Sequence, residues 1–158
     1  MLVKIDELRE FAKTVVNMLP SYDTEATILI MQGEMGAGKT TLTKEIAQRL
    51  GVEEKVQSPT FVLRRDYEAH HAKFNKLIHI DAYRLYGQEA KVLDIHNEVD
   101  SDRTLIVIEW GENVGEIPYD MLINISVKGM FERDMSIYTY QEEGEAYYED
   151  SDNNKYEK

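Results

Sequence analysis

Apolar and polar positions along the first third of the chain predict a helix, a strand, a loop and a second helix. Apolar residues recur at intervals of three and four over residues 5–19, which is typical of an amphipathic helix, and Pro20 closes it. The short apolar run 26–32 predicts a buried strand that leads into a glycine-rich stretch. Residues 40–50 return to the helical period, and Gly51 follows as a stop signal.

The middle of the chain predicts three strands and a helix. Residues 61–67 and 76–81 are rich in strand-forming side chains and are joined by a polar loop. A helix is expected over 89–99. Residues 104–110 (TLIVIEW) form another apolar run, which predicts a second strand of the buried type.

The end of the chain changes character. Residues 122–127 and 134–140 alternate apolar and polar side chains, which predicts an antiparallel pair of strands. Residues 142–158 hold seven acids and two lysines, with no Ile, Leu, Val, Met or Phe. We therefore expect one domain over 1–141 and a solvated or disordered acidic tail over 142–158.

Composition narrows the classes of function. The 158 residues suffice for one domain, and 30 acids against 18 Lys and Arg give a formal charge of -12. A protein with this negative charge repels the phosphate backbone, which disfavours a general nucleic-acid binder. The lack of cysteine excludes disulfide partners, thiolate zinc sites and cysteine nucleophiles. No apolar run approaches the roughly 20 residues that cross a bilayer. We expect a cytoplasmic protein with no membrane segment.

The glycine-rich stretch carries the strongest chemical signal. Residues 33–40 (GEMGAGKT) match G-x-x-x-x-G-K-[ST] at every fixed position, directly after a predicted strand and at the start of a predicted helix. Glycines let successive backbone N–H groups face phosphate oxygens. Lys39 can reach the β- and γ-phosphates, and Thr40 offers a hydroxyl to Mg²⁺. The sequence therefore predicts a nucleotide site of the P-loop type, with ATP or ADP and Mg²⁺.

Two acids end predicted apolar strands. Asp81 closes one and Glu109 another, and in a parallel sheet both would lie at the edge that carries the phosphate-binding loop. Spacing alone leaves open which acid touches the metal and which orients water. We interpret His79 as a packed strand residue. No metal-ligand spacing relates the other histidines, His70, His71 and His96.

Three other functions remain open at this stage. A P-loop kinase of a small molecule would need an acceptor pocket and an arginine-bearing lid, which no segment clearly supplies. A GTPase would need Asn-Lys-x-Asp, and Asn75-Lys76-Leu77 is followed by Ile78. A module that holds nucleotide without turnover would keep the loop and lack hydrolysis.

Four short motifs in order resemble one family. GEMGAGKTT (33–41), SPTF (58–61), HIDAYRL (79–85) and IEW (108–110) are similar to the TsaE family, small bacterial P-loop ATPases of tRNA threonylcarbamoyladenosine biosynthesis. The resemblance spans about residues 4–140. It implies an α/β, P-loop NTPase-like three-layer fold. Its sheet is mixed and mainly parallel, with helices on both faces and antiparallel strands late in the chain. It also implies ATP hydrolysis coupled to the partner proteins TsaB and TsaD.

The resemblance also implies roles for individual residues. Lys39, Asp81 and Glu109 would be catalytic, and Thr40 and Glu109 would bind Mg²⁺. Thr60 would sit in a switch-like loop that senses the γ-phosphate, although SPTF also suits a plain loop. Ordinary core packing is the alternative for Trp110. The expected nucleotide-binding residues are Met35, Gly36, Ala37, Gly38, Lys39, Thr40, Thr41, Thr60, Trp110, Glu132 and Arg133.

The expected activity is slow in isolation, because no arginine lies close enough in sequence to the loop to serve as an obvious finger. The acidic balance further implies that tRNA is met only indirectly, through the partners.

Overall fold

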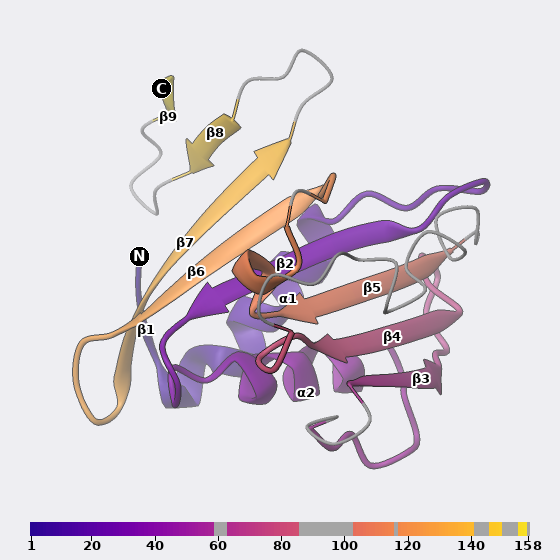
Figure 1. The fold of residues 1–158 in the computed structure, drawn as a ribbon, viewed down its shortest axis with the longest axis horizontal. Coiled ribbons are helices and arrows are strands. Elements are labelled where there is room, and N and C mark those ends of the chain that lie inside the picture. The colour runs from indigo at the N-terminus through magenta and orange to yellow at the C-terminus, as the bar shows by residue number, and fades with distance from the viewer. Residues whose placement is uncertain (59–62, 86–102, 116, 141–145, 150–154, 158) are drawn as a thin grey trace.

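The computed structural model describes residues 1–58, 63–85, 103–115, 117–140, 146–149 and 155–157 of the chain (Figure 1). Within these ranges the elements are, in chain order, β1 (Leu2–Lys4), η1 (Ile5–Glu7), α1 (Leu8–Met18), β2 (Thr27–Gly33), α2 (Lys39–Arg49), β3 (Arg64–Glu68), β4 (Lys76–Asp81), β5 (Thr104–Glu109), η3 (Gly111–Asn113), β6 (Met121–Val127), β7 (Glu132–Tyr140), β8 (Ala146–Glu149) and β9 (Lys155–Glu157).

The described strands form one sheet in the order β3-β4-β5-β2-β6-β7-β8-β9, and β1 pairs with β7. The four central strands run parallel: β4 pairs with β5, β5 with β2, and β2 with β6. The flanking pairs β3–β4 and β6–β7 are antiparallel. The α/β class, the parallel centre and the late antiparallel strands are therefore confirmed.

The two described α-helices, α1 and α2, cover the same face of the sheet, behind it in Figure 1, and they pack against each other. The larger apolar core lies between these helices and alternate residues of the central strands, such as Leu29, Leu77 and Val107. The intervening residues form a second cluster on the opposite face, with Ile30, Ile80 and Ile108 among them. The helix expected over 89–99 lies outside the described residues.

The central position of β5 in the sheet explains its nearly continuous apolar run, TLIVIE. All six residues of β5 are buried, because β5 has a neighbour on each side and apolar clusters on both faces. The strand expected over 104–110 ends one residue early. Trp110 adopts φ 59°, a left-handed conformation that turns the chain out of the sheet.

The first helix follows its predicted pattern. Leu8, Phe11 and Val15 lie on its buried stripe, and the chain becomes extended at Leu19, before Pro20. The backbone N–H of Lys4 donates to Glu7 Oε2 at 2.9 Å, which satisfies a donor ahead of the helix. None of the described helices is long and apolar enough to cross a membrane.

A lysine from another part of the chain closes the carboxyl end of α1. Lys73 Nζ donates to the carbonyl oxygens of Val16, Asn17 and Leu19 at 3.0, 2.9 and 2.8 Å. A cation is favoured at this end of a helix dipole, and its three protons match three carbonyls that the helix leaves without partners. Burial lowers the pKa of the Lys73 ammonium below its ordinary value.

Two further short strands are described near the end of the chain. Residues 146–149 and 155–157 form β8 and β9, which extend the sheet beyond β7. Tyr147 and Tyr148 are residue types that suit strands, and the β7 backbone supplies a hydrogen-bonding edge to pair with. The boundary at residue 141 stays a prediction.

Lys73→Met should lower the free energy of unfolding by about 1–3 kcal/mol, because three helix-end carbonyls lose a charged donor. Urea denaturation followed by circular dichroism measures the change. Lys44→Met, at an exposed position of α2, is the matched control and should stay within about 0.5 kcal/mol of the unaltered protein. Equal effects of the two variants would contradict a helix-closing role for Lys73.

Candidate functional site

The glycine-rich loop over 33–40, which the sequence predicts to bind phosphate, connects the end of β2 to the start of α2. Gly36 and Gly38 adopt φ 79° and 109°, conformations that other residues rarely take. A Cβ placed on either glycine would meet no atom within 4 Å, so the space beside the loop is open. Ala37 N–H donates to Glu34 O at 3.0 Å and closes the turn between them. The backbone thus forms an open cradle at a helix N-terminus, the arrangement that binds phosphate.

Lys39 lies under the loop, with only 5% of its surface exposed. Its Nζ donates to Gly33 O at 2.6 Å and to Glu34 O at 2.9 Å, and lies 4.0 Å from the ring centroid of Trp110. Burial lowers the pKa of the Lys39 ammonium, an effect that nearby acids, Glu109 foremost, oppose. The cation is thus held in place by backbone oxygens and an aromatic face.

Glu109 is the buried acid at the end of β5, with 2% of its surface exposed. Its Oε2 accepts a hydrogen bond from Thr40 Oγ1 at 2.9 Å. Its Oε1 lies 2.7 Å from His79 Nε2 and 3.2 Å from Thr43 Oγ1. The carboxylate therefore links β5 to β4 and to the first two turns of α2.

Asp81 lies opposite Glu109 in the parallel pairing of β4 and β5. Its Oδ1 accepts from the Tyr83 backbone N–H at 3.1 Å, and its Oδ2 from Ser58 Oγ at 3.5 Å. The two acids predicted from strand ends are thus neighbours at the edge that carries the loop. The Ser58 contact also brings the start of the SPTF motif to this edge, whereas Thr60 lies outside the described residues.

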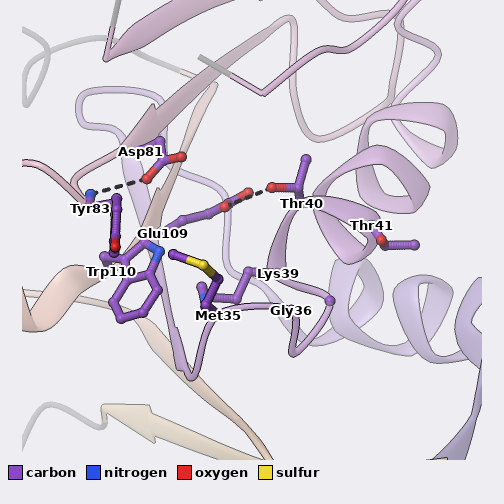
Figure 2. Close-up of a pocket in the computed structure, with 10 residues that line it drawn as sticks. Met35, Gly36, Lys39, Thr40, Thr41, Asp81, Tyr83, Glu109 and Trp110 are labelled. Atoms are coloured by element: carbon purple, nitrogen blue, oxygen red, sulfur yellow. Dashed lines mark hydrogen bonds between the residues drawn. The ribbon is translucent and has the colours of Figure 1, made fainter. Parts of the chain in front are cut away.

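Trp110 and Tyr83 form an aromatic pair beside the loop. Their ring centroids are 5.0 Å apart and their planes are inclined by 52°. Figure 2 shows Trp110 between Tyr83 and Lys39, with Asp81 and Glu109 at the ends of their strands. Trp110 is therefore not merely a core residue, since it lines an open cavity.

These groups surround a cavity of about 360 Å³. Its volume lies in the range of small-molecule sites. The lining residues are Met35, Gly36, Gly38, Lys39, Thr40, Thr41, Asp81, Tyr83, Glu109 and Trp110.

Glu132 and Arg133, two of the other residues expected near the nucleotide, do not line this cavity, and their role stays a prediction. Arg133 lines a second depression together with Gly36, Gly38 and Thr41 of the loop region. Its Nε donates to Ala37 O at 2.8 Å, and its Nη1 donates to the carbonyls of Gly129 and Glu132 at 2.9 and 3.0 Å. Glu132 lines a separate surface depression with Lys4 and neighbouring residues. Arg133 thus ties β7 to the loop backbone, and Ala37 is fully buried behind the loop.

Three features of the candidate site were not predicted from the sequence. They are the contact of Thr43 with Glu109, the pairing of Tyr83 with Trp110 and the contact of His79 with Glu109. His79 is fully buried, as interpreted, and it also meets a site carboxylate. The i, i+2 spacing of His79 and Asp81 places both on one face of β4. The i, i+3 spacing of Thr40 and Thr43 places both on one face of α2. Both signals were available in the sequence.

The donor set fits a nucleotide with Mg²⁺. Among the described residues no cluster of three or more His, Asp or Glu side chains is placed to hold a metal ion. Mg²⁺ in phosphate sites takes one or two protein oxygens, together with phosphate oxygens and water. The Thr40 hydroxyl and the Glu109 carboxylate are hard oxygen ligands of this kind, and they lie beside the open loop.

Comparison with known proteins finds relatives of one family. Residues 2–135 match the family model "Threonylcarbamoyl adenosine biosynthesis protein TsaE". A Streptomyces coelicolor protein named tRNA threonylcarbamoyladenosine biosynthesis protein TsaE is 38% identical over 116 residues, 73% of this chain and 75% of that protein. The Haemophilus influenzae protein of that name is 36% identical over 120 residues, 73% of each chain.

A solved structure agrees with the fold. The crystal structure of Bacillus subtilis YdiB aligns with a TM-score of 0.61 at 24% identity, over 91% of this chain and 86% of that one. The family model spans most of the chain, and relatives more than 30% identical cover over two thirds of it. The chain belongs to the TsaE family.

Proposed function

We propose that this chain binds ATP with Mg²⁺ in the cavity beside the phosphate-binding loop. We further propose that it hydrolyses ATP in support of tRNA threonylcarbamoyladenosine biosynthesis in the cytoplasm. The observation that carries the proposal is the 2.9 Å hydrogen bond from Thr40 Oγ1 to Glu109 Oε2. It joins the hydroxyl of the loop motif to a strand-end carboxylate, the two protein ligands that Mg²⁺ needs in a P-loop site. The biosynthetic role is the one that the relatives carry in their names.

The residues of the cavity divide the work of phosphoryl transfer. Thr40 and Glu109 hold the metal ion, and the loop N–H groups hold the phosphates. Lys39 donates two of its three protons to Gly33 O and Glu34 O, so its position is set and a third proton remains for a phosphate oxygen. Mg²⁺, when bound, neutralises charge on the phosphate oxygens.

Asp81 orients the attacking water in this proposal. Its carboxylate is held at Oδ1 by the Tyr83 backbone and meets Ser58 Oγ at Oδ2 only at 3.5 Å, whereas Glu109 accepts shorter hydrogen bonds at both oxygens. A carboxylate oxygen in such a place can accept a proton from water. Trp110 and Tyr83 supply aromatic surface beside the phosphates.

Coupling to TsaB and TsaD rests on the family resemblance and on two further features. No arginine is among the cavity-lining residues within the described part of the chain, so charge on the transferred phosphoryl lacks one common stabiliser. A partner that completes the site would explain a slow isolated enzyme. The formal charge of -12 also favours partners that hold most of the tRNA.

Lys39→Ala should weaken ATP binding by about 10- to 100-fold, because a charge-assisted hydrogen bond to phosphate is lost. Glu109→Gln should lower ATP turnover by about 100-fold or more, because it removes the charge of the proposed metal ligand. Binding is measured by fluorescence of Trp110, the single tryptophan, and turnover by phosphate release. Glu54→Gln, exposed on the loop after α2, is the matched control. Unchanged ATP affinity in Lys39→Ala would overturn the phosphate-loop assignment.

Phosphate release should rise when TsaB and TsaD are added together, and this rise should be absent in Lys39→Ala and Glu109→Gln. The measurement compares steady-state phosphate release and association of the three proteins on a sizing column. If neither association nor turnover depends on the partners, the biosynthetic coupling fails even where ATP binds. Stoichiometric transfer of phosphate to a metabolite would instead favour a small-molecule kinase.

A further inference from the structure

The two oxygens of the Glu109 carboxylate have different surroundings. Oε2 meets the hydroxyl of Thr40, a residue that lines the cavity. Oε1 points into the protein, where it meets His79 Nε2 at 2.7 Å and Thr43 Oγ1 at 3.2 Å. The orientation of the carboxylate therefore depends on what holds Oε1.

Counting protons shows which neighbour can hold Oε1. The Thr43 hydroxyl has one proton, and it lies 3.0 Å from Lys39 O as well as 3.2 Å from Glu109 Oε1. Both of those oxygens only accept, so Thr43 serves one at a time. As a metal ligand Glu109 acts in its carboxylate form, which only accepts, so in this proposal the 2.7 Å contact uses the tautomer of His79 with a proton on Nε2. Within the described residues, His79 is the donor that is committed to Oε1.

Packing alone does not account for a histidine at this position. His79 is fully buried on the face of β4 opposite to Ile78 and Ile80, and its Nδ1 has no hydrogen-bond partner in the described part of the chain. An apolar side chain there would leave no buried nitrogen unpaired. His79 lies opposite Val107, two residues before the Asp81–Glu109 pair, so its ring reaches along the sheet to Glu109.

We propose that His79 is a positioning residue for the metal site: it anchors Glu109 Oε1 so that Oε2 stays beside Thr40. The inference rests on the Mg²⁺ site of the proposed function and assigns His79 no contact with nucleotide or metal. Without the Nε2–H group, Thr43 holds Oε1 only in competition with Lys39 O, and the carboxylate is free to turn. Loss of the Nε2–H group therefore weakens the binding of a divalent metal ion and leaves nucleotide binding unchanged, because His79 does not line the cavity that takes the nucleotide.

The test compares His79→Gln with His79→Asn in the full chain. Gln carries its amide nitrogen about as far from Cα as His Nε2, whereas Asn carries it one bond closer and cannot reach Glu109 Oε1. Mn²⁺ binding to the ADP complex is measured by electron paramagnetic resonance, and ADP binding in EDTA by Trp110 fluorescence. We expect His79→Asn to weaken Mn²⁺ binding by about 10- to 100-fold and His79→Gln to restore it nearly to the unaltered value. ADP affinity in EDTA should stay within about twofold in both.

Two controls separate this effect from a loss of stability. Thr27→Val removes the hydrogen bond that another buried side chain of the same sheet donates, from Thr27 Oγ1 to Pro20 O, and should leave Mn²⁺ affinity unchanged. If His79→Asn shows no cooperative thermal melt, His79→Met, which fills the space without a donor, takes its place in the comparison.

The outcomes distinguish the inference from the function on which it rests. Equal Mn²⁺ affinity in the donor and non-donor variants would overturn the role of His79, as would an equal loss of ADP affinity in EDTA. If the unaltered ADP complex itself binds no Mn²⁺, the proposed metal site fails and the inference falls with it.

Discussion

The burial of the Glu109 carboxylate is the constraint on which the rest of the site depends. A buried charge is strongly unfavourable unless hydrogen bonds replace its water. Glu109 obtains these bonds from Thr40 and Thr43 on α2 and from His79 on β4. The helix that follows the phosphate-binding loop and two strands of the sheet must therefore take one relative placement. The loop motif and the strand-end acids meet because this carboxylate requires donors from both.

Strand register enforces the same arrangement. In the pairing of β4 with β5, Asp81 is opposite Glu109, and His79 lies on the same face one pleat earlier. A slip of one residue would turn His79 and Asp81 toward the face where Ile78 and Ile80 now pack. The alternating apolar residues of β4 prevent that slip. The slipped register would bury two polar side chains in an apolar cluster, and its free energy would therefore be far higher than that of the native register. The hydrophobic core and the candidate site thus specify each other.

The antiparallel strands at the end of the chain also support the loop. Arg133, at the start of β7, donates to Ala37 O and to two carbonyls of its own turn. A planar guanidinium with several fixed donors suits this bridging role. The resemblance to the TsaE family placed Glu132 and Arg133 near the nucleotide. Arg133 lines a depression with Gly36 and Gly38 of the loop, Glu132 lines another, and their contact with nucleotide stays a prediction.

Local sequence was sufficient for most elements. The period of three and four over 5–19, ended by Pro20, corresponds to η1 and α1, and the apolar run 26–32 corresponds to β2. The loop motif and the strand-end positions of Asp81 and Glu109 were also apparent, because a glycine-rich loop and the direction of parallel strands are local properties. The end of the strand at Glu109 rather than Trp110 was not apparent. Trp110 takes a left-handed conformation there and contacts Tyr83 and Lys39, which are distant in sequence.

The sequence by itself determined the types of element, the phosphate-binding loop and the two acids, because these follow from side-chain period and from short backbone motifs. Only the tertiary structure decided which donor meets which oxygen. His79 and Glu109 are 30 residues apart in sequence, and Ala37 and Arg133 are 96 apart. Such contacts arise from strand order and register, which no local pattern contains. The roles of His79 and Arg133 therefore become visible only in the folded chain.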